Sequence, residues 1–317
     1  MSGELHVIVG SGQVGDPLAR LLLSQGKRVR MVRHSSTGDM AGVQVVRGDL
    51  LDAKSVRDAA EGAAVIYHCA NPPYFARLWE EALPKWIENL IAAAAGTGAR
   101  LVVLDNVYAF GDLGGKALDE DRSMQPSSRK GAVRAQVAQR LMEAHAKGEA
   151  RVTIGRASDF WGPGCTQTYF GDQFWPDAFA GKPVRTLGRI DLPHTFHYIA
   201  DVVAGIAALG SAPDDVTGKW WMLPCQPPVT TAAMMERLAA AAGLTLRTTA
   251  VGPVMQRILG LFIKVLPELR EMSYQWDAPF VMDDSRFRAA FPALRPTEVD
   301  AGVIATVAWA RAKYARA

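Results

Sequence analysis

The sequence lacks the features that mark several large classes of protein. It has only three cysteines, at widely spaced positions 69, 165 and 225 and without a C-x-x-C pair, so we expect reduced thiols and neither disulfides nor a metal site. The formal net charge is only +3, and no block of Lys and Arg interleaved with aromatic residues is present. This composition argues against a nucleic-acid partner.

The chain also lacks an apolar run long enough to span a membrane. Its most apolar late stretch, residues 251–267, is interrupted by Gln256, Arg257 and Lys264, and it favours an amphipathic helix that covers a pocket or a subunit contact. The first expected strand begins at Leu5, which leaves no room for a signal peptide. We therefore expect a cytoplasmic monomer or homodimer with no membrane partner, acting on a small-molecule substrate.

A glycine-rich turn organises the first part of the chain. Residues 5–9 (LHVIV) predict a buried strand of a parallel sheet, and residues 10–15 (GSGQVG) then lead into a helix. Gly10, Gly12 and Gly15 fit the G-x-G-x-x-G spacing, in which glycines permit a tight turn and a close backbone approach to a pyrophosphate. Gln13 and Val14 lie within this turn, where backbone N–H groups at the helix start favour phosphate. The pattern predicts a dinucleotide site.

The end of the second expected strand, residues 28–32, indicates which dinucleotide is bound. An acidic residue at this position accepts hydrogen bonds from the ribose hydroxyls of NAD, whereas a basic one accommodates the extra phosphate of NADP. Arg33 occupies the position, and His34 and Ser35 follow it. Arginine suits phosphate recognition, so we predict NADP(H) in preference to NAD(H). The alternative is an ordinary exposed arginine at a strand end.

Strands and helices alternate along the rest of the first half, which predicts an α/β fold, a Rossmann-type doubly wound parallel sheet with a smaller C-terminal α/β substrate lobe. We expect residues 1–155, joined by 190–210, to form the nucleotide domain, and residues 156–189 and 211–317 to form the lobe. Expected strands in the first half cover residues 43–46, 65–70, 100–104 and 152–154, and expected helices cover 55–62, 78–96 and 131–147. Expected lobe elements are strands at 220–223 and 246–251, helices at 230–243, 286–290 and 299–314, and a candidate lid at 268–276.

Several short sequence segments resemble those of one known family. They are the glycine turn, Gly48-Asp49-Leu50, Tyr67-His68-Cys69-Ala70, residues 159–164 (DFWGPG) and residues 196–202 (FHYIADV). Their order resembles the extended short-chain dehydrogenase/reductase superfamily, in particular the NAD-dependent epimerase/dehydratase family and its atypical members. The glycine spacing departs from the G-x-x-G-x-x-G of many extended members.

The resemblance implies roles for residues at the carboxyl edge of the sheet. Asp49 and Leu50 would contact the adenine, and the nicotinamide end would be lined by Cys69, Ala70, Asn71, Lys130, Ala157 and Ser158. Candidate substrate residues are Tyr74, Phe160, Tyr169 and Phe174, for which core packing is the alternative. His194, His197 and Tyr198 are expected to be packing or hydrogen-bonded core groups, with a catalytic histidine as the alternative.

The catalytic pattern of the family is broken in this chain. Asn106 stands where the family has its catalytic Ser or Thr, and Lys130 and Arg134 stand at the positions of Tyr and Lys in Tyr-x-x-x-Lys. In one interpretation these three side chains face the nicotinamide, and Lys130 donates a proton if burial and Arg134 depress its pKa. Tyr108 is a second candidate acid. In the other, Lys130 and Arg134 are solvated residues of a surface helix.

Three functions follow from these observations. The leading hypothesis is an NADP(H)-dependent oxidoreductase acting on a small, largely apolar carbonyl or hydroxyl substrate with a non-standard catalytic set. The enzymatic alternative is an NADP-dependent epimerase or dehydratase that works through a transient keto intermediate. The third possibility is a regulator that binds NADP(H) without turnover, which the loss of Tyr-x-x-x-Lys favours.

Overall fold

The central feature of the fold is a seven-stranded, fully parallel sheet, seen in a computed structural model that describes residues 3–34, 38–186, 188–252, 256 and 260–315. The strand order is β11-β6-β5-β4-β1-β2-β3. The strands are β1 (Leu5–Val9), β2 (Arg28–Arg33), β3 (Val43–Arg47), β4 (Ala63–His68), β5 (Arg100–Asp105), β6 (Arg151–Arg156) and β11 (Lys219–Met222). The predicted doubly wound α/β class is confirmed.

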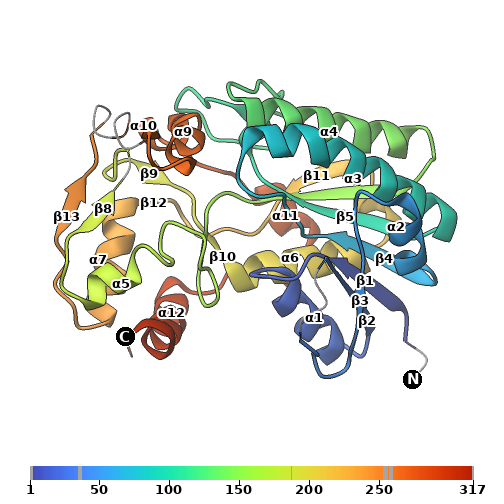
Figure 1. Ribbon diagram of the computed structural model, residues 1–317, viewed down its shortest axis with the longest axis horizontal. Helices are drawn as coiled ribbons and strands as arrows, with labels where there is room; N and C mark the ends of the chain where they lie inside the picture. The colour runs from blue at the N-terminus through green and yellow to red at the C-terminus, as the bar shows by residue number, and fades with distance from the viewer. Residues whose placement is uncertain (1–2, 35–37, 187, 253–255, 257–259, 316–317) are drawn as a thin grey trace.

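Helices cover both faces of this sheet, as Figure 1 shows. One face carries α2 (Ala53–Ala60), α3 (Ala76–Thr97) and α4 (Arg129–Ala146), and the other carries α1 (Gly15–Ser24) and α6 (Ile199–Ser211). All five residues of β1 are buried, because helices pack on both of its sides. Side-chain caps set two helix starts: Asp52 accepts a hydrogen bond from the Lys54 amide, and Ser128 accepts one from the Gly131 amide.

A smaller lobe extends from the carboxyl edge of the sheet, at the left in Figure 1. Its helices α5, α7 and α12 enclose an apolar cluster that contains Trp161, Phe170, Phe174 and Trp175. The remaining elements are β7 (Phe160–Trp161), α5 (Trp175–Phe179), β8 (Val184–Thr186), β9 (Pro193–His194), β10 (His197–Tyr198), β12 (Val229–Thr230), α7 (Thr231–Ala241), β13 (Thr248–Ala250), α9 (Val265–Arg270), α10 (Tyr274–Asp277), α11 (Ser285–Ala290) and α12 (Val299–Tyr314), with 3-10 turns at Tyr108–Phe110 and Asp214–Val216. No helix in the described ranges has the length and apolar character needed to cross a membrane.

The strand expected in the lobe at residues 220–223 belongs instead to the central sheet. As β11 it pairs in parallel with β6, from Lys219 opposite Thr153 to Met222 opposite Arg156. Trp221 and Met222 are buried there, and α11 packs against the strand. The prediction was wrong because an apolar strand segment shows that it will be buried but does not show which sheet it joins.

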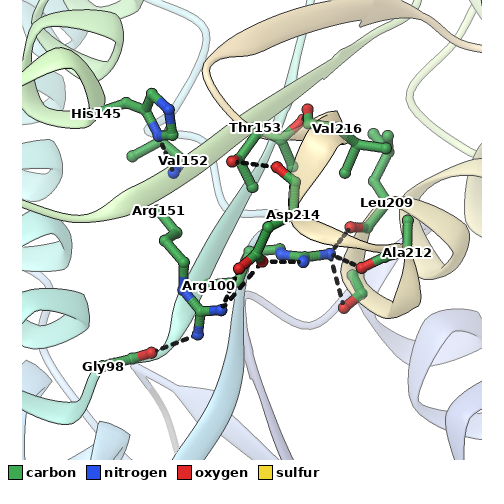
Figure 2. A network of polar contacts seen from close by, with 12 residues as sticks. Gly98, Arg100, His145, Arg151, Val152, Thr153, Leu209, Ala212, Asp214 and Val216 are labelled. Carbon is green, nitrogen blue, oxygen red and sulfur yellow. Dashed lines mark hydrogen bonds and ion pairs between the residues drawn. The ribbon is translucent and has the colours of Figure 1, made fainter. Parts of the chain in front are cut away.

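The amino ends of β5 and β6 are tied to the end of α6 by a polar network, shown in Figure 2. Arg100 donates to the carbonyl oxygens of Leu209 at 2.8 Å and Ala212 at 2.6 Å, and it pairs with Asp214 at 2.7 Å. Arg151 pairs with the same carboxylate at 3.1 Å. Ligands of open α/β sheets bind at the opposite, carboxyl edge, so this network stabilises the fold.

Candidate functional site

The glycine turn has the geometry of a phosphate cradle. Gly10 has a φ of 103°, and a Cβ there would lie 2.7 Å from the Ala70 amide nitrogen. A Cβ on Gly15 would lie 1.9 Å from the Gly10 carbonyl oxygen, so both positions require glycine for packing. Gly12, with a φ of 143°, faces open space. The glycine turn is therefore tight at Gly10, closely packed against the helix start at Gly15, and open at Gly12.

The start of α1 behind this turn offers donors to an anion. Val14 is the N-cap residue, and it makes no side-chain hydrogen bond to the first turn of the helix. Backbone N–H groups at such a helix start favour phosphate oxygens. The residues present therefore fit the pyrophosphate of a dinucleotide.

Arg33 lies beside α1 at the end of β2. Its Nη2 atom is 3.4 Å from Asp16 Oδ1, and its Nη1 donates to the Gly38 carbonyl oxygen at 3.0 Å. The side chain is only 12% exposed, so it is not the freely exposed arginine of the alternative interpretation. His34 is exposed, and Ser35 lies outside the described residues.

The turn after β3 is fixed by short-range contacts. Asp49 Oδ1 accepts from the Leu51 amide at 2.9 Å, and the Asp49 amide donates to Ser55 Oγ at 3.0 Å. A Cβ on Gly48 would lie 2.4 Å from Val32 Cγ1, so only glycine lets this turn pack on β2. The turn lies beside the ends of β1 and β2, and Asp49 and Leu50 line a small cavity there with Val9 and Val32.

Two buried arginines share the carboxylate that ends β5. Arg134 Nη1 is 3.1 Å from Asp105 Oδ1, and Arg156 Nη1 is 2.8 Å from Asp105 Oδ2. Arg134 also donates to Asn71 Oδ1, and its guanidinium lies over the Trp79 ring, 4.5 Å from the centroid. With Arg134 only 2% exposed, the interpretation of a solvated surface helix was wrong.

Lys130 is fully buried at the start of α4 and is held by the candidate lid. Its Nζ atom is 2.6 Å from Glu268 Oε2, 2.6 Å from Glu271 Oε1 and 3.1 Å from the Glu268 carbonyl oxygen. An ammonium group has three N–H donors, and these contacts occupy all three. Glu268 Oε2 also accepts from the Ala76 amide at 2.9 Å, at the start of α3. In this arrangement Lys130 holds α9 against the start of α4. It has no N–H donor left for a substrate.

We expect Lys130→Met to destabilise the protein by about 3–5 kcal/mol, because it leaves two largely buried carboxylates without their counter-ion. Glu268 and Glu271 are 19% and 22% exposed. Urea unfolding followed by circular dichroism measures the change. The matched control is Arg129→Ala, the preceding residue of the helix, whose partner Glu80 lies on the surface, and it should change the stability far less because solvent screens that pair. Equal losses of stability in the two variants would contradict a special contribution from the buried ion pairs of Lys130.

Two phenols meet at the same edge of the sheet. Tyr108 Oη is 3.2 Å from Tyr74 Oη, and the Tyr108 ring stacks on Trp79 at 6.1 Å between centroids. Burial raises the pKa of Tyr108 to about 12, with a further contribution from the Asp159 carboxylate. Burial also raises the pKa of Tyr74 above its ordinary value. Both groups are therefore protonated at neutral pH.

Asn106 fixes the turn that carries Tyr108. Its Oδ1 atom accepts from the Tyr108 amide at 3.0 Å, which is an Asx turn, and its carbonyl oxygen accepts from Arg156 at 2.8 Å. Cys69, at the end of β4, has its pKa raised to about 12 by burial, so it is a thiol that packs and not a thiolate.

The two lobe histidines have different settings. His197 Nδ1 accepts from the Ser158 amide at 3.2 Å and its Nε2 donates to the Leu223 carbonyl at 3.2 Å, while burial lowers its pKa to about 4. It is a neutral structural group that positions Ser158. His194 Nε2 is 2.9 Å from Asp159 Oδ2, in a pair between β9 and the loop after β6.

The four aromatic residues predicted to contact substrate have different surroundings. Phe174 is 1% exposed inside the lobe cluster, 5.8 Å from Phe170 between ring centroids, so its placement matches the core-packing alternative. The Tyr169 ring lies 5.4 Å from the Phe170 ring between centroids, in a tilted arrangement. Phe160 is partly buried in β7, and Tyr74 lies with Tyr108. Of the four, Tyr74 is the one that the structure places beside candidate catalytic groups.

Sequence reasoning missed several of these residues. They are Trp79, Asp105, Arg156 and Asp159, together with Glu268 and Glu271 as the partners of Lys130. Asp105 and Arg156 carried a usable signal, since each ends a buried strand at the edge where ligands bind, and Asp159 begins the segment 159–164 that resembles the family. Trp79, Glu268 and Glu271 lie on or next to helices without a motif.

Residues 7–221 match the sequence model of the NAD-dependent epimerase/dehydratase family, which covers more than half of the chain. The chain belongs to this family. Solved structures with the same fold include the UDP-glucuronic acid 4-epimerase of Bacillus cereus in complex with NAD, with a TM-score of 0.81, 15% identity, and coverage of 98% of this chain and 99% of that one. The dTDP-glucose 4,6-dehydratase DesIV of Streptomyces venezuelae, with NAD and TYD bound, has a TM-score of 0.79 and 17% identity, with coverage of 98% of each chain.

A curated relative matches over a short stretch. Sterol demethylase protein B of Methylococcus capsulatus (strain ATCC 33009 / NCIMB 11132 / Bath) is 42% identical over 64 residues, which is 19% of this chain and 20% of that protein. The chain thus matches about one fifth of the length of this relative.

Proposed function

We propose that this protein is an NADP(H)-dependent oxidoreductase that reduces a small, largely apolar carbonyl compound. The observation that carries the proposal is the pair of protonated phenols, Tyr108 and Tyr74, at the edge of the sheet where Asn106 also lies. Lys130 and Arg134, the other catalytic candidates, are held by carboxylates in this arrangement. The pair therefore replaces the Tyr-x-x-x-Lys chemistry of the family.

The proposed reaction needs one proton from the protein. Bound NADPH supplies a hydride to the carbonyl carbon. Tyr108 Oη donates its proton to the carbonyl oxygen as that oxygen gains negative charge, and Tyr74 Oη then donates a hydrogen bond to the phenolate that remains. Solvent returns the proton to Tyr108, so that the net change is addition of one hydride and one proton to the substrate.

The cofactor site comprises the glycine turn, Asp49 and Leu50 at the adenine end, and Ala70, Asn71, Ala157 and Ser158 toward the nicotinamide. We assign it to residues 1–155 and 190–210, with β11 completing the sheet. The substrate lobe comprises residues 156–189 and the rest of 211–317. An apolar substrate is favoured by the rings of Tyr108, Tyr74, Phe160 and Tyr169. The name of the curated relative, sterol demethylase protein B, also favours an apolar substrate.

We expect Arg33→Ala to weaken NADPH binding about tenfold or more and to change NADH binding less than about twofold, because NADH lacks the extra phosphate that the guanidinium would contact. Fluorescence titration of the two reduced cofactors measures both affinities. Arg28→Ala removes an exposed cation at the other end of β2 and should affect neither. Tighter binding of NADH by the wild-type protein, in line with the NAD present in the structural neighbours, would overturn the assignment of NADP(H).

Reductase activity is tested directly by following the absorbance of NADPH across a panel of ketones and aldehydes, from small to polycyclic. We expect oxidation of NADPH with apolar members of the panel. Tight binding of NADPH without its oxidation by any member would reject the reductase and leave a regulator that binds NADP(H). That second function is favoured by the ion pairs that occupy Lys130 and Arg134. Conversion of a nucleotide sugar with no net change in cofactor would instead identify an epimerase or dehydratase, as family membership suggests.

A further inference from the structure

Three consecutive apolar side chains project from the lobe immediately before α9. Leu261 and Phe262 are each 81% exposed, and Ile263 is 45% exposed. We call residues 261–263 the apolar tip. Among the described residues the other exposed large apolar side chains are Leu51 and Ile304, which stand singly. Single exposed apolar residues are ordinary, whereas a contiguous group indicates an interaction surface.

The charged residues that flank the tip along the chain have one sign. Residues 237–267 contain no Asp or Glu, although they contain three Arg and one Lys. Lys264, next to the tip, is exposed, and so is Arg270 at the end of α9. The nearest acidic residues that follow, Glu268 and Glu271, face inward and are engaged by Lys130. Among the described residues, the exposed side chains from the tip to the end of α9 are therefore apolar or cationic.

We propose that the apolar tip docks on a lipid surface that carries anionic headgroups. Apolar side chains beside cations are the combination that binds the interface of such a surface, with the apolar groups below the headgroups and the cations among them. A projecting tip also suits a lipid layer, because lipid needs no complementary groove. Docking at the interface requires no membrane-spanning helix, so it is compatible with the helix lengths of this fold. It revises the expectation that no membrane takes part, and it is independent of the proposed reaction.

The test is co-sedimentation of the full chain with vesicles of phosphatidylcholine, with or without phosphatidylglycerol. We expect the wild-type protein to bind the anionic vesicles, and more weakly at high salt. The variant Leu261→Ser/Phe262→Ser/Ile263→Ser should bind at least about tenfold more weakly, because its apolar area is lost. Lys264→Glu should weaken binding about fivefold or more. The control Leu51→Ser/Ile304→Ser removes the two isolated exposed residues and should bind like the wild type.

Equal binding by the wild type and the triple variant, or no binding to anionic vesicles, would overturn the proposal. Analytical ultracentrifugation distinguishes a protein contact. If the wild type self-associates, the triple variant does not, and neither binds vesicles, the tip is a contact between copies of this chain and the lipid proposal is wrong. Thermal unfolding and NADPH titration of the triple variant show that its fold is intact.

Discussion

Tyr108→Phe is expected to lower kcat for carbonyl reduction by about 10²–10⁴-fold and to leave NADPH affinity unchanged, because it removes the proton donor and keeps the ring that stacks on Trp79. Stopped-flow or steady-state absorbance of NADPH measures the rate. Tyr67→Phe is the control, since Tyr67 is a fully buried phenol on another strand that bonds to His6 at 3.0 Å. It should retain wild-type turnover. Full activity in Tyr108→Phe would show that the proton comes from another group.

The pH profile gives an independent test of the same role. Because burial raises the pKa of Tyr108 to about 12, its proton-donating form predominates at neutral and mildly alkaline pH. We expect no loss of reduction rate from this group as pH rises across that range. Alcohol oxidation needs the phenolate form, so it should be slow near neutral pH and accelerate toward the pKa of Tyr108. A fall in reduction rate just above neutrality that Tyr108→Phe abolishes would contradict this assignment.

Asp105→Asn is expected to destabilise the folded chain by about 3–5 kcal/mol, because the guanidinium groups of Arg134 and Arg156 would be left buried without a counter-ion. Asp105 holds them at 3.1 Å and 2.8 Å, and both arginines are at most 2% exposed. Burial already lowers the pKa of Arg156, which shows the strain on its charged form. Urea unfolding at neutral pH measures the loss.

The chain contains its own control for this prediction. Asp214 also bridges two arginines, Arg100 and Arg151, at the amino ends of the strands (Figure 2), but its side chain is 61% exposed. Solvent screens an exposed pair, so Asp214→Asn should shift the urea midpoint far less than Asp105→Asn. Comparable shifts would mean that burial does not set the strength of the Asp105 bridge.

The sequence by itself determined the sheet, the glycine turn and the family. These rest on local constraints: β-branched runs such as residues 7–9 form buried strands, and glycines at 10, 12 and 15 are imposed by backbone approach over a few residues. The alternation of strands and helices then leaves few topologies. The sequence did not predict that strand β11 joins the central sheet, because its pairing with β6 joins segments that are far apart along the chain.

Only the tertiary structure decided the surroundings of Lys130 and Arg134. Lys130 meets Glu268 across 138 positions, and Arg134 meets Asn71 and Asp105 from two other strand ends. Such partners leave no periodicity or spacing in the sequence, since the fold alone brings them together. A lysine and an arginine four residues apart therefore suggested either catalysis or a solvated helix. Buried ion pairs of these two side chains hold α4 to the lid and to the sheet, beside the phenol pair that we propose carries the chemistry.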